Sequence, residues 1–169
     1  MSDQIDEKII SIRLMLESDT PTLERILNEP EVQLYYPMSN TREVSDALRV
    51  WHFYMRQGSV FTIEVGGQPA GLAVLYVSSY EKLKRQALFA IVIGKQYRGK
   101  GLGSKLLTYL IDKAKNQFGI KLLHLEMYEG NPAKSLYERF GFKHYASHER
   151  FLKESSGVYK AKVMMELQL

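Results

Sequence analysis

The chain of 169 residues contains no cysteine. Disulfide scaffolds, thiolate zinc sites, iron–sulfur clusters and cysteine nucleophiles are therefore excluded. Long apolar runs are also lacking, since none approaches the ~18 residues of a membrane-spanning helix. The polar start of the chain, Met1 to Lys8, lacks the pattern of a signal peptide. These absences lead us to expect a cytoplasmic protein without a membrane partner.

The composition has no extreme either. Apolar residues make up 45% and charged residues 25% of the chain, which is typical of a soluble globular protein. A chain of this length can bury roughly 70% of the surface that it exposes when unfolded. Because no repeat, low-complexity tract or linker interrupts the sequence, we expect one domain over residues 1–169.

Charge is distributed unevenly along the chain, although the net charge is only +4. Residues 1–46 carry a net charge of −6, and the remaining residues carry +10. A basic segment attracts anionic partners and an acidic one attracts cations, unless both are simply solvated surfaces. Because no nucleic-acid-binding motif accompanies the basic residues, we expect no nucleic-acid partner.

Apolar periodicity predicts one strand and two helices in the N-terminal third. Alternation over Lys8–Leu16 indicates a strand. Its apolar face is expected to hold Ile10, Ile12, Leu14 and Leu16. Helix start and stop signals then predict helices over Thr20–Asn28 and Asn40–Gly58, with a loop over Glu29–Ser39 between them.

The rest of the chain predicts a mixed sheet with two further helices. Three strand signals in close succession indicate an antiparallel meander, and helical periodicity then alternates with strands. The expected segments are Ser59–Val65, Ala70–Ser78, Gln86–Ile93, Leu102–Phe118, Ile120–Met127, Asn131–Gly141, Phe142–Phe151 and Val158–Leu167. The order β-α-α-β-β-β-α-β-α-β-β places the chain in the mixed α/β (α+β) class.

A glycine-rich stretch between a strand and a helix is the strongest local signal. Gly99, Gly101 and Gly103 alternate with other residues just before the long helix. Glycines allow a positive φ and close approach of a ligand, and a helix N-terminus offers unpaired N–H groups. The pattern therefore predicts an anion cradle suited to a pyrophosphate.

Three phosphate-binding motifs can be compared with this stretch. The dinucleotide fingerprint G-x-G-x-x-G does not fit, because the glycines are spaced as G-x-G-x-G. A Walker A loop fits up to Lys100, but Gly101 stands where Ser or Thr would hold Mg²⁺. Only the form Arg98-x-x-Gly101-x-Gly103 fits completely.

This form resembles the acetyl-coenzyme A signature of the GCN5-related N-acetyltransferase (GNAT) family. A second stretch resembles another hallmark of the family, a strand followed by a short helix. Its matching residues are Leu125, Glu126, Met127, Asn131, Ala133, Leu136, Tyr137, Phe140, Gly141 and Phe142. The order of elements over nearly the whole chain is also similar to the family. A weaker likeness points to the polyamine and L-amino-acid N-acetyltransferase branch.

The resemblance implies a mostly antiparallel central sheet, flanked by helices and splayed where acetyl-CoA binds, with no metal. It implies that backbone before the glycine loop pairs with the pantetheine arm, and that loop N–H groups hold the pyrophosphate. The cofactor-binding residues expected on this basis are Ile91, Val92, Ile93, Arg98, Gly99, Lys100, Gly101, Leu102, Gly103, Ser104, Asn131 and Lys134.

Tyr137 is the candidate general acid, since it matches the tyrosine of the family's second hallmark. Transfer of an acyl group expels a thiolate, which a nearby proton donor stabilises. A phenol with a pKa of about 10 stays protonated at neutral pH and can donate. The alternative is that Tyr137 only packs with Leu136 and Phe140 on a helix face.

The general base is left open by the sequence. Many family members carry a carboxylate near the start of the strand before the glycine loop, where this chain has Leu88. A water chain could take its place. The protein candidates are Glu126, Glu129 and His124.

The family resemblance places the acceptor between the first two helices, where Glu29, Glu31, Tyr35 and Tyr36 lie. Carboxylates and aromatic faces suit a cationic amine, so we expect a polyamine or an amino acid. Trp51 is expected in the core. Because cysteine is absent, the amine is expected to attack acetyl-CoA directly in a ternary complex.

Other functions and assemblies agree with the same residues. The acceptor can instead be a protein N-terminus or a lysine side chain. A non-catalytic acyl-CoA sensor would use the same cradle; Leu88 favours it and Tyr137 argues against it. The last strands could supply the interface of a homodimer.

Overall fold

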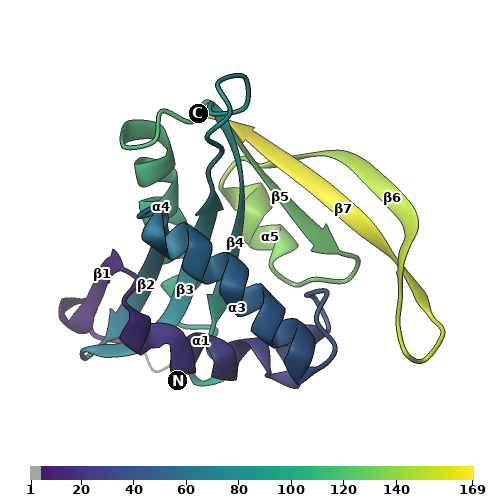
Figure 1. Cartoon of the computed structure of the whole chain (residues 1–169), viewed down its shortest axis with the longest axis horizontal. Coiled ribbons are helices and arrows are strands. Elements are labelled where there is room, and N and C mark those ends of the chain that lie inside the picture. Colours follow the sequence, from purple (N-terminus) through teal and green to yellow (C-terminus); the bar gives the residue numbers. More distant parts are fainter. Residues whose placement is uncertain (1–4) are drawn as a thin grey trace.

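The computed structural model describes residues 5–169, so the first half of the predicted polar start, residues 1–4, lies outside the described part. Its central feature is a seven-stranded sheet in the order β1-β2-β3-β4-β5-β7-β6 (Figure 1). The strands are β1 (Ile10–Leu14), β2 (Val60–Val65), β3 (Gln68–Tyr76), β4 (Gln86–Ile93), β5 (Leu122–Tyr128), β6 (Lys143–Lys153) and β7 (Tyr159–Gln168). Neighbours are antiparallel except for β4 and β5, which confirms the predicted fold class.

Helices lie on both faces of this sheet. The α-helices are α1 (Thr20–Leu27), α2 (Pro30–Gln33), α3 (Thr41–Arg56), α4 (Leu102–Asn116) and α5 (Lys134–Arg139). Short 3₁₀ turns are η1 (Glu7–Ile9), η2 (Glu17–Asp19) and η3 (Lys95–Tyr97). Figure 1 shows α1 and α3 crossing in front of β2 to β4. No helix within residues 5–169 is both long and apolar enough to cross a membrane.

Each face of the sheet buries its own apolar cluster. On the α1–α3 side, Leu23, Val92 and Trp51 are buried, and Trp51 is only 3% exposed. On the other side, the apolar stripe of α4 packs on β2 to β5, with Leu106 and Leu110 fully buried. The prediction that Trp51 belongs to the core is confirmed.

Strands β4 and β5 pair for only part of their length. The register joins Gln86–Leu88 to Leu122–His124, and no pairing continues beyond Leu88. β4 nevertheless runs on to Ile93, and β5 runs on to Tyr128. The two strands therefore diverge in the middle of the sheet, and this splay is the one that the family resemblance predicted.

Two predictions for the N-terminal third need correction. The predicted loop over Glu29–Ser39 contains α2, which Pro30 begins at a position where its fixed φ suits a helix. The predicted apolar face of the first strand holds for Ile10 and Ile12 but fails beyond them, because Leu14 is 50% exposed while Met15 is buried.

The reason for the second correction lies where β1 ends. The chain leaves the strand alternation there and enters η2, whose Asp19 is 1% exposed. Arg13 donates two hydrogen bonds, of 2.7 and 2.9 Å, to the Asp19 carboxylate. Thr62 Oγ1 donates a third at 2.8 Å and the Leu16 N–H a fourth at 2.9 Å. This buried polar centre, and not apolar alternation, determines the path after Arg13.

Candidate active site

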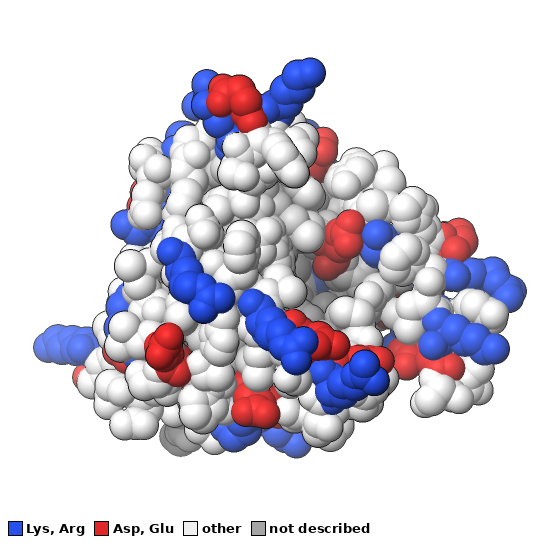
Figure 2. Space-filling model, in the orientation of Figure 1, with Lys and Arg blue, Asp and Glu red and all other residues white. Residues whose placement is uncertain are grey.

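A cavity of about 760 Å³ opens where β4 and β5 diverge. Figure 2 shows the hollow between the helical part of the molecule and the part that carries the last strands, with acidic and basic side chains at its rim. Of the predicted site residues, Ile91, Val92, Ile93, Arg98, Gly99, Gly101, Leu102, Gly103, Ser104, Asn131, Tyr137, Glu31, Tyr35 and Tyr36 line it. Lys100, Lys134 and Glu29 do not. Within residues 5–169, no cluster of His, Asp or Glu could hold a metal ion.

The glycine loop forms one end of this cavity. Gly99 and Gly101 have φ angles of 71° and 79°, which side chains rarely adopt, and Gly101 is the N-cap of α4. A Cβ added to Gly101 would meet no protein atom within 4 Å, so the space beside the backbone is open. The first N–H groups of α4 have no partner within the helix. Positive potential, exposed N–H groups and free space fit a pyrophosphate.

Glu29 anchors this loop and does not face the cavity. Its carboxylate pairs with the Arg98 guanidinium and accepts the Lys95 N–H at 3.2 Å. The Glu29 side chain is only 11% exposed. Arg98 also donates Nε–H to the Ile93 carbonyl at 2.9 Å. Glu29, which was predicted to bind the acceptor, is therefore placed as a support for the glycine loop.

The other predicted acceptor carboxylate, Glu31, lines the cavity but already has a partner. Lys95 Nζ lies 2.6 Å from its Oε1, and this hydrogen bond lowers the pKa of the Glu31 carboxyl. Lys105 similarly pairs with Glu7 at 2.8 Å. Three acidic residues of the N-terminal part thus pair with bases in and around the glycine loop.

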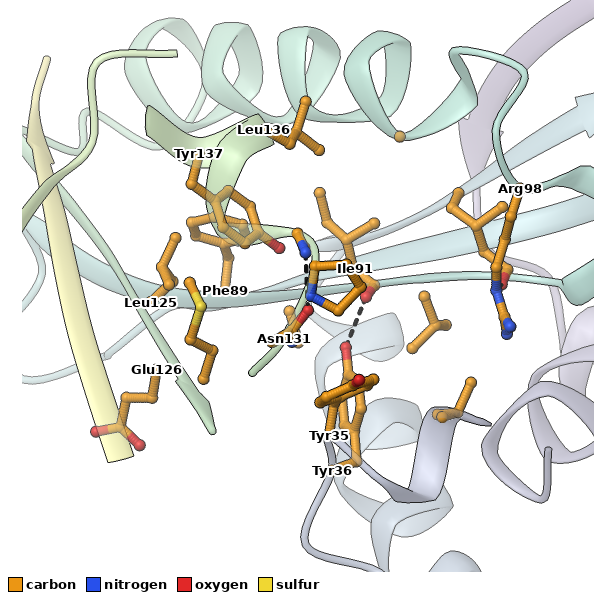
Figure 3. Close-up of a pocket in the computed structure, with 18 of the residues that line it drawn as sticks. Tyr35, Tyr36, Phe89, Ile91, Arg98, Leu125, Glu126, Asn131, Leu136 and Tyr137 are labelled. Atoms are coloured by element: carbon orange, nitrogen blue, oxygen red, sulfur yellow. Dashed lines mark hydrogen bonds between the residues drawn. The ribbon is translucent and has the colours of Figure 1, made fainter. Parts of the chain in front are cut away.

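Along the end of β4, the backbone hydrogen-bonding groups point alternately toward β3 and toward the gap. Gly94 donates its N–H to the Ala70 carbonyl of β3 at 2.9 Å, so Val92 also directs its backbone to β3. The backbone groups of Ile91 and Ile93 face the gap instead. Tyr36 Oη donates to the Ile91 carbonyl at 2.6 Å, as Figure 3 shows. Of the three predicted β4 residues, Ile91 and Ile93 therefore offer an edge for backbone pairing.

Tyr137 lines the cavity from α5. Its ring packs edge-on against Phe89 and Phe142, with centroid distances of 5.8 Å to each. Figure 3 shows the hydroxyl directed into the space between β4 and the Asn131 loop. Burial raises the pKa of Tyr137 to about 12, so its proton is held at neutral pH. Both the packing and the proton-donor interpretations of Tyr137 agree with this position.

The structure separates the candidate bases. His124 does not line the cavity; its ring hydrogen-bonds with Gln86 Oε1 at 2.6 Å, and burial lowers its pKa. Glu129 accepts the Ala161 N–H at 3.3 Å and also lies outside the lining. Glu126 does line the cavity, and so does Leu88. Glu126 is therefore the candidate base that the geometry retains.

Several lining residues had no signal in the local sequence. They are Tyr76, Tyr97, Tyr128, Arg139 and Lys162. Lys162 is brought to the cavity by pairing of β7 with β5, which sets it opposite Tyr128. No spacing rule links these two positions, so only the strand register could have revealed them.

The segment predicted to start at Asn131 becomes helical only further along the chain. The helix α5 begins at Lys134, and the Asn131 Oδ1 accepts the Ala133 N–H at 2.9 Å. This local bond shapes the turn that leads into the helix. Asn131 thus borders the cavity together with Ala133, in the turn that precedes α5.

Comparisons with known proteins agree with this geometry. The sequence is 32% identical over 119 residues to the spermine/spermidine N(1)-acetyltransferase of Bacillus subtilis, covering 69% of this chain and 77% of that protein. It is 36% identical over 87 residues to the ribosomal protein bS18-alanine N-acetyltransferase of Haemophilus influenzae, covering 52% and 59%.

Solved structures share the fold over nearly the whole chain. The yncA protein of Salmonella typhimurium, solved with its cofactor acetyl-CoA, superposes with a TM-score of 0.80 at 23% identity, covering 95% of this chain and 94% of that one. The family description "Acetyltransferase (GNAT) family" matches residues 23–142. That match spans both the glycine loop and the Tyr137 helix, and the chain belongs to the GNAT acetyltransferase family.

Proposed function

We propose that this protein transfers an acetyl group from acetyl-CoA to the primary amine of a small molecule, a polyamine or an amino acid. The observation that carries the proposal is the joining of three features in one cavity: the splayed β4 edge, the glycine loop and the Tyr137 hydroxyl. None of these features alone requires acetyl transfer, but together they match the needs of a thioester donor.

The donor end would be held by backbone groups. The N–H groups of Gly99 to Ser104 would bind the pyrophosphate at the start of α4. The backbone N–H groups of Ile91 and Ile93, whose carbonyls already accept from Tyr36 and Arg98, would pair with the pantetheine arm, as an added strand would. Arg98, fixed by Glu29 and the Ile93 carbonyl, would hold the loop in shape. Lys100 and Lys134 would act only as nearby positive charges.

Acetyl-CoA supplies an acyl thioester when bound. Glu126 would take a proton from the acceptor ammonium, directly or through a water molecule, and leave a neutral amine. This step costs about 4.6 kcal/mol at pH 7 for an amine with a pKa of 10.4, so a positioned base helps. As the C–N bond forms and the C–S bond breaks, Tyr137 would give its proton to the departing sulfur.

Aromatic side chains support an amine acceptor. Tyr35 and Tyr36 line the cavity from the segment after α2, and Tyr76 and Tyr128 line it from the sheet. Aromatic faces attract ammonium groups. The similarity to a spermine/spermidine N(1)-acetyltransferase also supports an amine acceptor. A protein N-terminus is the second candidate acceptor, since the chain is also similar to a ribosomal-protein-alanine N-acetyltransferase.

The test is acetyl-CoA binding by calorimetry together with free-thiol release over a panel of acceptors. The panel holds spermidine, free amino acids and an alanine-initiated peptide. Binding with thiol release and a mono-acetylated product supports transfer, and the best acceptor identifies the class. Binding without release on any acceptor would instead favour an acyl-CoA sensor, and absence of binding would contradict the proposal altogether.

A further inference from the structure

A lysine at the edge of the cavity is almost buried but only partly paired. Lys162 of β7 lines the cavity and its side chain is 12% exposed. Its Nζ lies 3.3 Å from Glu126 Oε1 and 4.1 Å from the centroid of the Phe151 ring. Among residues 5–169, Glu126 is its one acidic partner within salt-bridge distance. An ammonium has three N–H donors, so Lys162 keeps capacity for a second anion.

A buried ammonium is stable when its donors are satisfied. The neighbouring Lys160 illustrates the satisfied case. Its Nζ lies 3.1 Å from Glu154 and donates to the Leu34 carbonyl at 3.4 Å, which links β7 to the segment after α2. Lys160 does not line the cavity, whereas Lys162 does. The two lysines differ in environment although they lie two residues apart on one strand face.

Glu126 and Lys162 present opposite charges side by side at the acceptor end. The register sets Glu126 opposite Met164 and Tyr128 opposite Lys162, so the charged pair shares one face of the sheet. The Glu126 side chain is 43% exposed and can turn toward a ligand. At the donor end, by contrast, Glu29 and Glu31 are occupied by Arg98 and Lys95.

We infer, on the basis of the proposed transferase function, that the acceptor is an α-amino acid whose zwitterionic head is bound by this pair. Lys162 holds the α-carboxylate, and Glu126 binds the α-ammonium and takes its proton. The amine then attacks the thioester carbonyl, the C–N bond forms and the C–S bond breaks, and Tyr137 gives its proton to the departing sulfur. The attacking nitrogen loses its second proton through water, which returns a proton to Tyr137, and Glu126 releases the first proton to solvent. A polyamine offers Lys162 no anion and sets like charges together, which is unfavourable.

The test compares each amino acid with its own α-amide, which removes the carboxylate charge and keeps the amine and side chain. The acceptors are L-methionine, L-phenylalanine and L-lysine, their amides, and spermidine. Thiol release gives kcat/KM, and calorimetry with coenzyme A present gives acceptor affinity without turnover. The variants are Lys162→Gln, Lys162→Arg and, as control, Lys143→Gln, which changes an exposed lysine at the other end of the β6–β7 hairpin.

We expect at least one acid to exceed its amide by about tenfold or more in kcat/KM, as loss of a charged hydrogen bond predicts. Lys162→Gln should remove that difference, mainly through KM and acceptor affinity, with the amide changed less than about twofold. Lys162→Arg should retain most of it, and Lys143→Gln all of it.

Amides or spermidine that match every acid would overturn the amino-acid inference while leaving acetyl transfer intact. An equal loss on acid and amide in Lys162→Gln would assign Lys162 a packing role only. If the protein failed to bind acetyl-CoA, or if none of the acceptors in the panel gave thiol release, the proposed function itself would be contradicted. The amino-acid inference, which rests on that function, would then fail as well.

Discussion

At the scale of single residues, Tyr137 shows how a packed side chain can also carry chemistry. Its ring is held by Phe89 and Phe142, while its hydroxyl borders the cavity. The surroundings are apolar, and burial raises its pKa to about 12. The neutral phenol is therefore the stable form over the whole physiological range, and its proton is available to a leaving group.

We predict that Tyr137→Phe lowers kcat by about 10²-fold, because general acid catalysis contributes at least that much. The ring and its packing remain, so the Kd for acetyl-CoA should change by less than about twofold. Single-turnover thiol release and calorimetry measure the two effects. A variant that kept the wild-type single-turnover rate would leave Tyr137 with a packing role.

The same pKa gives a sign for alkaline stability. A group whose folded pKa lies above its unfolded value of 10.0 stabilises the fold below that value. The contribution is lost as pH rises from about 10 through about 12. Tyr137→Phe should therefore flatten the fall of Tm in that window relative to wild type. Identical slopes in both proteins would show that the folded and unfolded pKa values of Tyr137 do not differ.

Gly101 is the residue whose backbone conformation matters most for the donor end. Its φ of 79° disfavours any side chain, and no protein atom occupies the adjoining space. We predict that Gly101→Val weakens acetyl-CoA binding at least tenfold, or about 1.4 kcal/mol. The matched control is Gly67→Val, since Gly67 also has a positive φ of 76° but lies in the β2–β3 turn. Equal acetyl-CoA affinity in the two variants would place the cradle elsewhere.

At the scale of elements, the segment around α2 is tied to the glycine loop by Glu29 and to β4 by Tyr36. Glu29, the N-cap of α2, pairs with the Arg98 guanidinium and accepts the Lys95 N–H. Tyr36 bonds the Ile91 carbonyl, and burial raises its pKa well above the usual 10.0. The α2 segment of the cavity wall is thus fixed to both β4 and the glycine loop.

We predict that Glu29→Gln weakens acetyl-CoA binding about fivefold or more, because Arg98 loses its carboxylate partner and the loop its anchor. The control is Glu81→Gln, which removes an 83% exposed carboxylate from its pair with Lys84 and should leave affinity unchanged. Calorimetry on both variants measures their affinity for acetyl-CoA. A fall confined to acceptor kcat/KM would instead return Glu29 to the acceptor site.

The Arg13–Asp19 centre joins β1, η2 and β2. Burial alone would raise the pKa of Asp19, but hydrogen bonds from Arg13, Leu16 and Thr62 outweigh it and lower the pKa. A lowered folded pKa stabilises the protein above the unfolded value of 3.8, and this stabilisation is lost as pH falls through the folded pKa. Protonation of Asp19 should therefore contribute to the loss of stability at acid pH.

We predict that Arg13→Met destabilises the fold by about 3 kcal/mol, because it leaves the buried Asp19 carboxylate without its cation. The control is Arg49→Met, whose partner Asp46 is 57% exposed, and its Tm should stay near wild type. Urea unfolding at pH 7 measures both. Equal midpoints for the two variants would mean that Asp19 finds other compensation.

At the scale of the whole molecule, the opposite charges of the two parts of the chain meet in the fold. Residues 1–46 carry −6 and the rest +10, and Glu7, Glu29 and Glu31 pair with Lys105, Arg98 and Lys95. The surface consequently shows both signs intermixed, as Figure 2 shows for one face. Part of the charge asymmetry along the chain is therefore cancelled by ion pairs within the fold. Less negative charge remains on the N-terminal part to attract a cationic acceptor.

The sequence by itself determined the fold class, the family and the place of the glycine loop. The spacing of Arg98, Gly101 and Gly103 between a strand and a helix is local, and local backbone conformation follows from it. Tyr137 was found in the same way, through its place in a short contiguous motif. Such features can be recognised from the sequence alone, because the groups that act together are also neighbours along the chain.

Only the tertiary structure decided which charges pair with one another around the cavity. Glu29 and Glu31 pair with cations more than 60 residues away, as the separations of 69 and 64 show. Glu126 meets Lys162 through the register of β5 and β7, across 36 residues. Charge pairing depends on distance in space, and strand order and register set that distance, so no local pattern could assign these partners.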